Sequence, residues 1–132
     1  MDFHDLIQPG LRRVDTYLVE EEHTAKHVGS GSSRVLATPW MILFMERTCH
    51  RCLAERLPSG YSSVGTAVDI RHLAPARVGS TVEVRGEVLS VDGLRVFFSV
   101  EVRQGDTIIG NGKHERFIID EQRFLKRLEA AK

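Results

Sequence analysis

The sequence predicts an α+β fold in which one long apolar helix lies against an antiparallel sheet of about five strands. Three observations predict it: a helical pattern at residues 39–57, a change to a two-residue period after Gly60, and short turn signals between the later apolar runs. The 132 residues suit one domain, which we place at residues 1–132. The apolar share of 42% is enough to build one core.

A first strand is expected at residues 11–19, where apolar and polar residues alternate. Residues 39–57 form the helix, because helix-favouring residues are frequent there and Pro58 follows. Thr38 is expected at the N-cap, with Pro39 at the first helical position. Residues 40–45 are all apolar, which a helix tolerates only when it is buried on most sides.

Period-two alternation predicts four further strands after Gly60. Asp92–Gly93 indicates a two-residue hairpin, and residues 104–106 turn into a last strand at residues 107–119. A short amphipathic helix at residues 121–131 closes the chain. In the first of these strands the alternation places five residues on one face: Val64, Thr66, Val68, Ile70 and His72.

Charge and composition limit which partners and which cellular compartment we expect. The net charge of zero argues against a nucleic-acid or anionic-membrane partner, and the apolar run at residues 40–45 is too short to span a membrane. With 2 cysteines and no signal-peptide pattern, we expect a cytoplasmic protein. A sheet of this size has a free edge that favours pairing with a second copy, so we expect a homodimer, with a tetramer also open.

Four residues are candidates for chemistry. Glu46 follows six apolar residues, so a desolvated carboxylate could act as general base or nucleophile; the alternative is a solvent-facing position on the helix. His72 ends an apolar strand face, where it could move a proton or serve as a structural histidine. Thr38 fits a cap or the mouth of a pocket, and Gly65 fits close ligand approach or a bulge.

The spacing of these residues limits how they can meet. Thr38 and Glu46 are separated by eight residues, a rise of about 12 Å along a helix, so they cannot bond to each other directly. We therefore expect a site assembled from several elements, with both subunits of a dimer as possible contributors.

Three short strings resemble a known family: Ala37-Thr38 with Met45-Glu46, Gly65-Thr66-Ala67 with His72, and Gly112-Lys113-His114-Glu115-Arg116. Over residues 11–124 the chain resembles the fluoroacetyl-CoA thioesterase-like family of acyl-CoA thioesterases, which have the hotdog fold. The resemblance implies that Thr38, Glu46 and His72 are catalytic and that Gly65 offers a backbone N–H to the thioester oxygen. Fluoroacetyl-specific members carry an aromatic lid where residues 29–33 here are a short Gly/Ser segment. The sequence therefore does not support fluoroacetyl specificity.

The function expected is hydrolysis of a short- to medium-chain or small aryl acyl-CoA to free acid and CoA. No cofactor or metal is expected, because thiolate is already a good leaving group and no cluster has ligand spacing. Two alternatives remain: a hotdog dehydratase or hydratase acting on an acyl thioester, and a dimer that binds an acyl thioester or small ligand without catalysis.

Three other motifs are interpreted as structural. Cys49 and Cys52 form a C-x-x-C string in mid-helix and are expected to be core residues. The polar residues 113–116 are expected to be mainly solvated, with CoA phosphate contact by Lys113 or Arg116 as the alternative. The acidic residues 20–22 are expected to form a solvated face.

Overall fold

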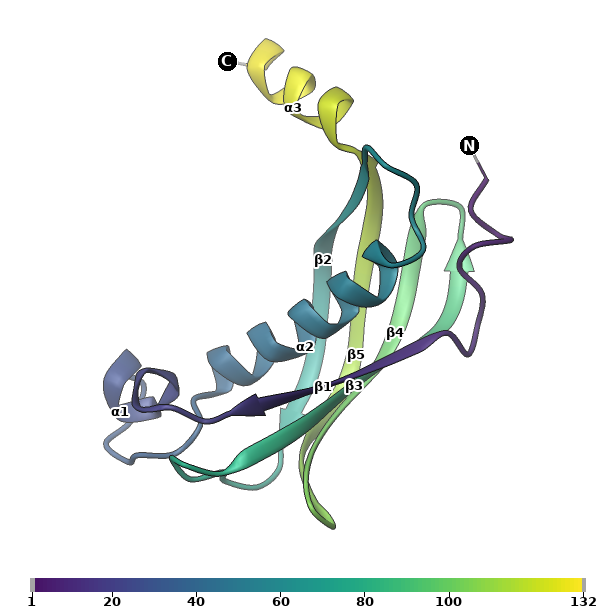
Figure 1. Cartoon of the computed structure of the whole chain (residues 1–132). Helices are drawn as coiled ribbons and strands as arrows, with labels where there is room; N and C mark the ends of the chain where they lie inside the picture. The colour runs from purple at the N-terminus through teal and green to yellow at the C-terminus, as the bar shows by residue number, and fades with distance from the viewer. Residues whose placement is uncertain (1, 132) are drawn as a thin grey trace.

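The computed structural model describes residues 2–131 and shows a curved antiparallel sheet with one long helix lying across one face (Figure 1). The strands, in spatial order, are β1 (Arg12–Leu18), β3 (Thr81–Asp92), β4 (Arg95–Gln104), β5 (Thr107–Asp120) and β2 (Tyr61–His72). The helices are α1 (Ala25–Val28), α2 (Thr38–Ala54) and α3 (Glu121–Ala130), and a 3-10 turn, η1, spans Glu21–His23. The predicted fold class and the order of the five strands and two longer helices are confirmed, whereas η1 and α1 were not predicted.

The core lies between α2 and the concave face of the sheet. The buried residues of α2 recur every three or four positions: Met41, Phe44, Met45, Thr48, Cys49, Cys52 and Leu53. Both cysteines are free and buried, as predicted, and burial raises the pKa of the Cys52 thiol to about 11. The helix approaches β3 so closely that a Cβ on Gly86 would lie 2.7 Å from the Cys49 sulfur.

Two tight hairpins set the register of β3, β4 and β5. Their turn residues are Gly93–Leu94 and Gly105–Asp106. Gly93 and Gly105 have φ values of 61° and 58°, and glycine at the first turn position is typical of hairpin turns of this hand. The first turn is therefore one residue later than the predicted Asp92–Gly93 turn, because the positive φ falls on the first rather than the second turn residue.

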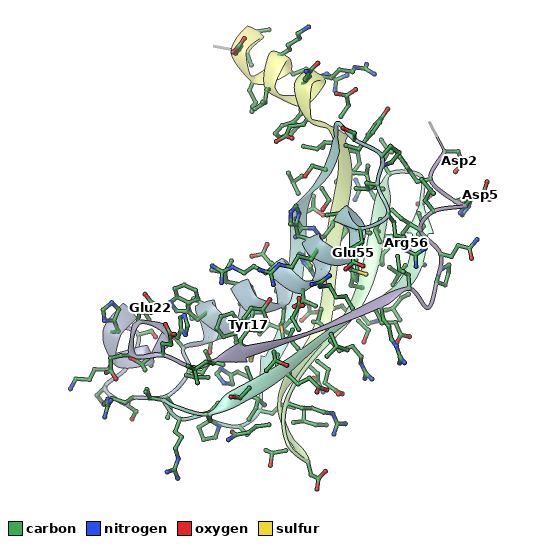
Figure 2. The ribbon with its side chains drawn as sticks, viewed as in Figure 1. Asp2, Asp5, Tyr17, Glu22, Glu55 and Arg56 are labelled. Carbon is green, nitrogen blue, oxygen red and sulfur yellow. The ribbon has the colours of Figure 1, made fainter. Side chains whose placement is uncertain are left out.

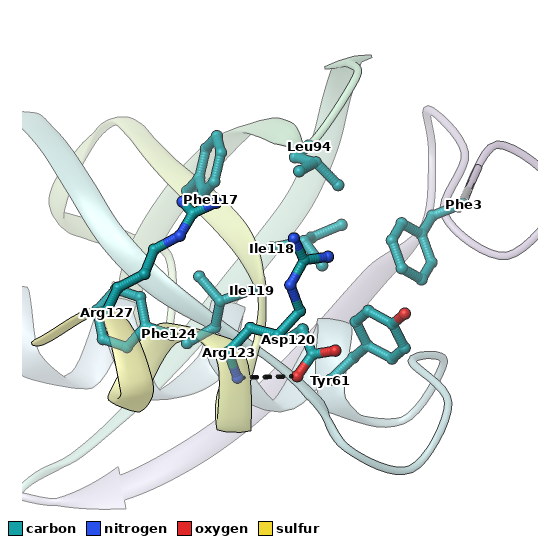
Figure 3. Close-up of a pocket in the computed structure, with 10 residues that line it drawn as sticks. All are labelled: Phe3, Tyr61, Leu94, Phe117, Ile118, Ile119, Asp120, Arg123, Phe124 and Arg127. Atoms are coloured by element: carbon teal, nitrogen blue, oxygen red, sulfur yellow. Dashed lines mark hydrogen bonds between the residues drawn. The ribbon is translucent and has the colours of Figure 1, made fainter. Parts of the chain in front are cut away.

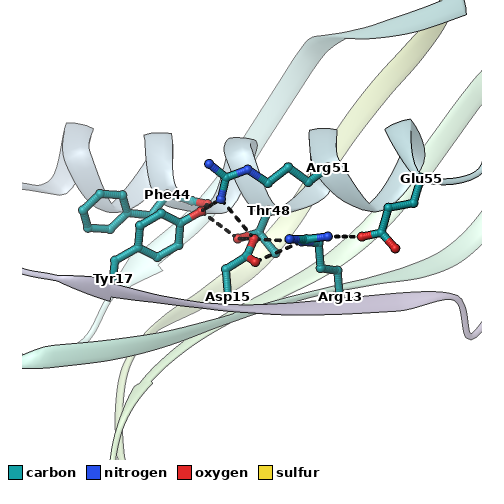
Figure 4. Close-up of polar contacts among 7 residues, drawn as sticks. All are labelled: Arg13, Asp15, Tyr17, Phe44, Thr48, Arg51 and Glu55. Atoms are coloured by element: carbon teal, nitrogen blue, oxygen red, sulfur yellow. Dashed lines mark hydrogen bonds and ion pairs between the residues drawn. The ribbon is translucent and has the colours of Figure 1, made fainter.

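A polar cluster ties the edge strand β1 to α2 (Figure 4). Asp15, whose side chain is 11% exposed, accepts a hydrogen bond from the Thr48 hydroxyl at 3.0 Å and pairs with Arg13 and Arg51. Tyr17 lies between β1 and α2 (Figure 2), where its hydroxyl is 3.1 Å from that of Thr48. β1 is an edge strand whose neighbour in the sheet is β3. The polar cluster therefore gives β1 a second attachment, to α2.

We predict that Asp15→Ala lowers the free energy of unfolding by about 2 kcal/mol, because Thr48 and two guanidinium groups lose a shared, nearly buried acceptor. Urea denaturation measures the change. The matched control is Glu55→Gln, which removes an exposed partner of Arg13 and should change stability by less than about 0.5 kcal/mol. Equal effects of the two substitutions would contradict the stabilising role of the cluster.

Candidate active site

Thr38 and His72 meet where α2 begins and β2 ends. The Thr38 Oγ1 atom lies 2.7 Å from His72 Nδ1. The structure corrects the predicted cap, because Ala37 occupies the N-cap with extended backbone and Thr38 is the first residue of α2. A hydroxyl already inside the helix is not placed to cap it, and that of Thr38 bonds to the imidazole instead.

The His72 ring is half-buried, and loss of water around it lowers its pKa below the ordinary 6.5. The ring is therefore neutral at pH 7. Its Nε2 atom is buried and has no hydrogen-bond partner among the described residues. When Nε2 carries the proton, Nδ1 accepts the hydrogen bond from Thr38 O–H, and His72 can then take the proton of that hydroxyl.

Glu46 and Gly65 form a second pair, between the middle of α2 and β2. A Cβ added to Gly65 would lie 2.7 Å from Glu46 Oε2, so any larger residue would displace the carboxylate from its present position. The Glu46 side chain is 36% exposed and its Oε2 lies 4.0 Å from Arg116 Nη1. Glu46 thus lies between the two expectations, because its carboxylate is partly open to solvent while one of its oxygens faces the sheet.

A bulge in β2 brings both pairs to the same face of the sheet. Gly65 and His72 are seven residues apart, and residues at odd spacing in a regular strand point to opposite faces. Gly65 pairs with Arg116 and Ala67 with Glu115 on β5, so Thr66 is the extra residue. Beyond it the alternation is reversed, and both Gly65 and His72 face α2.

The bulge also corrects the predicted strand face. Val68, Ile70 and His72 share a face as expected, but Thr66 is exposed and hydrogen-bonds to Glu115 on the other side of the sheet. Val64, which alternates with Gly65, is likewise on the side away from α2. The alternation in the sequence could not reveal which residues share a face, because one extra residue in the strand turns every later side chain to the opposite face.

Behind the Glu46–Gly65 pair lies a buried polar chain, which we call the His114 chain and which consists of Ser63, His114 and Arg116. These residues are 6%, 3% and 6% exposed. The prediction that residues 113–116 are mainly solvated is therefore wrong for two of its members. The signal was present, since His114, Arg116 and the core residue Ile118 alternate along β5.

The two pairs do not touch within one chain. Thr38 and Glu46 are eight residues apart on α2, a separation of about 12 Å. The structure thus shows two half-sites on one face: Thr38 with His72, and Glu46 with Gly65. It does not show a single constellation of all four residues.

Another polar cluster and a cavity lie away from these residues. Glu20, Glu22 and His23 gather their ligand atoms within 4.8 Å, but His23 Nδ1 accepts the Glu20 backbone N–H in a turn cap. A cavity of about 290 Å³ lies beside α3 and includes Phe117, Arg123 and none of the four predicted site residues (Figure 3). No helix in residues 2–131 is both long and apolar enough to cross a membrane.

Comparison with known proteins identifies the family. The model of the fluoroacetyl-CoA-specific thioesterase family matches residues 19–122. The chain belongs to this family. It is 34% identical over 126 residues to the fluoroacetyl-CoA thioesterase of Streptantibioticus cattleyicolor, covering 91% of both chains. It is therefore a thioester hydrolase, and the resemblance stated from the sequence is confirmed.

Solved structures confirm the hotdog fold. A mutant of a fluoroacetyl-CoA-specific thioesterase in complex with fluoroacetate and CoA has a TM-score of 0.84 at 33% identity, covering 89% of this chain and 99% of the other. A hot-dog-like protein from Thermanaerovibrio acidaminovorans has a TM-score of 0.91 at 26% identity, covering 99% and 97%. A thioesterase superfamily member from Thermus thermophilus has a TM-score of 0.84 at 29% identity, covering 95% of both chains.

Proposed function

We propose that this thioesterase hydrolyses a short- to medium-chain or small aryl acyl-CoA, with Glu46, Gly65, Thr38 and His72 as its working residues. One observation carries the proposal: the bulge in β2 turns a carboxylate–glycine pair and a hydroxyl–imidazole pair toward the same face of the sheet. Acyl transfer to water requires a base, a backbone N–H that stabilises the charge on the carbonyl oxygen, and a group that carries a proton.

At the Glu46–Gly65 half-site the thioester carbonyl lies against the glycine backbone. Glu46 takes a proton from water as the water oxygen bonds to the carbonyl carbon, and the negative charge that develops on the carbonyl oxygen is stabilised by the Gly65 N–H. The C–S bond then breaks, and CoA leaves as a thiolate. The proton held by Glu46 reaches that thiolate, so acid and thiol are the products.

Glu46 can act instead as the nucleophile, with an acyl anhydride that water then hydrolyses. The Thr38–His72 hydrogen bond offers a further route, since a hydroxyl beside a neutral imidazole is an activated nucleophile. In the water route His72 and Thr38 orient the thioester or deliver a proton to sulfur. Trapped acyl-enzyme in a rapid-quench experiment, assigned by mass spectrometry, distinguishes the three routes.

We propose that a homodimer completes the site. β2 is an edge strand; Val68 within it is 41% exposed, and Leu73 just after it is 56% exposed. Antiparallel pairing of two β2 strands, with the two-fold axis at Asp69 and Thr66 again unpaired, sets Gly65 opposite His72 of the partner subunit. The Glu46–Gly65 half-site of each protomer then meets the Thr38–His72 half-site of the other.

The range of acyl groups that the site accepts depends on the residues that cover its opening. Residues 29–33 are small or polar and exposed, so they supply no aromatic side chain to close over a substrate of two carbons. This favours acceptance of several acyl groups. Because a curated relative is a fluoroacetyl-CoA thioesterase, fluoroacetyl-CoA belongs in the substrate panel beside acetyl, butyryl, octanoyl and benzoyl esters.

We predict that purified protein releases thiol from at least one acyl-CoA of this panel and that Glu46→Gln lowers kcat at least about a hundredfold, because the amide cannot accept a proton from water. The matched control, Glu55→Gln, lies near the end of α2 and should retain wild-type kcat. Wild-type turnover in Glu46→Gln would remove Glu46 from the mechanism. Absence of hydrolysis for every ester would refute the proposed substrate class.

A shared site makes a second prediction. Glu46→Gln and His72→Ala are each inactive alone, but co-refolding equal amounts should restore about a quarter of wild-type activity, because half of the dimers are mixed and each has one intact site. Thiol release measures the recovery, and co-refolding Glu46→Gln with Thr38→Ala should give the same result. Inactive mixtures, with mixed dimers verified by native mass spectrometry, would show that each site lies within one protomer.

A further inference from the structure

The bulge at Thr66 is held from both faces of the sheet by consecutive residues of β5. On the helix side, His114 Nδ1 lies 2.8 Å from the Ala67 carbonyl oxygen. On the other side, the Thr66 hydroxyl donates to the Glu115 backbone carbonyl at 3.2 Å and also contacts the Glu115 carboxylate. A bulge interrupts the regular ladder, so these bonds compensate for pairing lost at the extra residue.

The chemistry of Arg116 fixes the protonation of His114. Arg116 Nη1 lies 3.1 Å from His114 Nε2, and a guanidinium can only donate. His114 Nε2 therefore accepts, Nδ1 carries the proton, and Nδ1–H donates to the Ala67 carbonyl. Burial lowers the pKa of His114, so the ring remains neutral at pH 7.

Arg116 is in turn fixed by Ser63 on β2. Its Nε donates to the Ser63 hydroxyl at 2.8 Å, and its Nη2 donates to the Ser63 carbonyl at 3.1 Å. Nη1 is directed to His114 and lies 4.0 Å from Glu46 Oε2. The guanidinium thus has one orientation, with its positive charge beside the candidate base.

We propose that His114 is a positioning residue for the Glu46–Gly65 half-site. It holds the carbonyl at the β2 bulge with one ring nitrogen and the Arg116 guanidinium with the other, and so fixes both the Gly65 backbone and the charge that faces Glu46. His114 acts through these groups, since neither ring nitrogen faces the open side of the half-site. This role rests on the proposed function.

Substitutions at His114 separate its two bonds. His114→Asn keeps a donor near the Nδ1 position, His114→Gln keeps an acceptor near Nε2, and His114→Phe keeps a ring of similar size but neither bond. The Phe98 ring, whose centroid is 6.4 Å away, offers an apolar neighbour for the new ring, so the Phe variant is the packing control.

We expect His114→Phe to lower kcat about a hundredfold while KM changes by less than about threefold, because displacement of the reacting groups by about 1 Å has an effect of this size. His114→Asn and His114→Gln should each recover part of that loss. Wild-type kcat per folded molecule in His114→Phe would overturn the proposal. So would losses that follow only the melting temperature across the three variants.

An NMR measurement that does not depend on catalysis tests this proposal separately from the proposed function. The ¹⁵N–¹H signal of Gly65 should shift in His114→Phe and His114→Gln, which lose the bond to Ala67, and stay close to its wild-type position in His114→Asn. Unchanged Gly65 signals in all variants would refute positioning through the bulge, whatever the activity. If wild-type protein hydrolyses no acyl-CoA, the proposed function fails while the Gly65 signals still decide whether His114 sets the bulge. Should His114→Phe fail to fold, the contrast between Asn and Gln gives the same decision.

Discussion

One extra residue in an edge strand is the constraint on which the candidate site depends. Without Thr66 as the unpaired residue, Gly65 and His72 would lie on opposite faces of β2 at their present spacing. With it, the glycine faces the carboxylate of Glu46 and the imidazole faces the hydroxyl of Thr38. The position of the Glu46 carboxylate and the His72 imidazole on one surface therefore follows from the backbone pairing of β2 with β5.

The residues that hold this bulge are energetically expensive to bury. A guanidinium that is 6% exposed loses most of its hydration, and its carboxylate neighbour remains partly in water at 4.0 Å. Burial lowers the pKa of Arg116, the direction expected when desolvation outweighs the attraction of Glu46. Apolar side chains would fill this space at a lower cost in desolvation. Their absence beside a candidate base indicates a functional reason for the buried charge.

Much of the fold follows from periodicity alone. The apolar run at the start of α2, the alternation in β3 and β4, and the glycine turns each specify one local structure, and all of them agree with one sheet around one helix. The family resemblance joined Thr38, Glu46, Gly65 and His72 into one set of candidate site residues. Their pairing was not predicted, because Thr38 meets His72 and Glu46 meets Gly65 only through contacts between α2 and β2.

The features that sequence reasoning missed share a physical cause. The bulge depends on which residue of β2 is left unpaired, and this is decided by pairing with β5 rather than by composition. His114 and Arg116 are polar types that are usually solvated, yet their alternation with Ile118 placed them inside. The hydroxyl of Thr38 satisfies an imidazole instead of a helix end because α2 begins one residue earlier than the proline suggested.

A crystal structure of the protein with 2-oxopentyl-CoA, an analogue of butyryl-CoA in which a methylene between the sulfur and the carbonyl carbon prevents hydrolysis, tests the central claim most directly. We predict the analogue's carbonyl oxygen at about 3 Å from the Gly65 nitrogen, with Glu46 of the same protomer on one side and His72 of the partner subunit on the other. An analogue bound in the cavity beside α3, or with its carbonyl away from both half-sites, would contradict the claim that the bulge in β2 builds the active site.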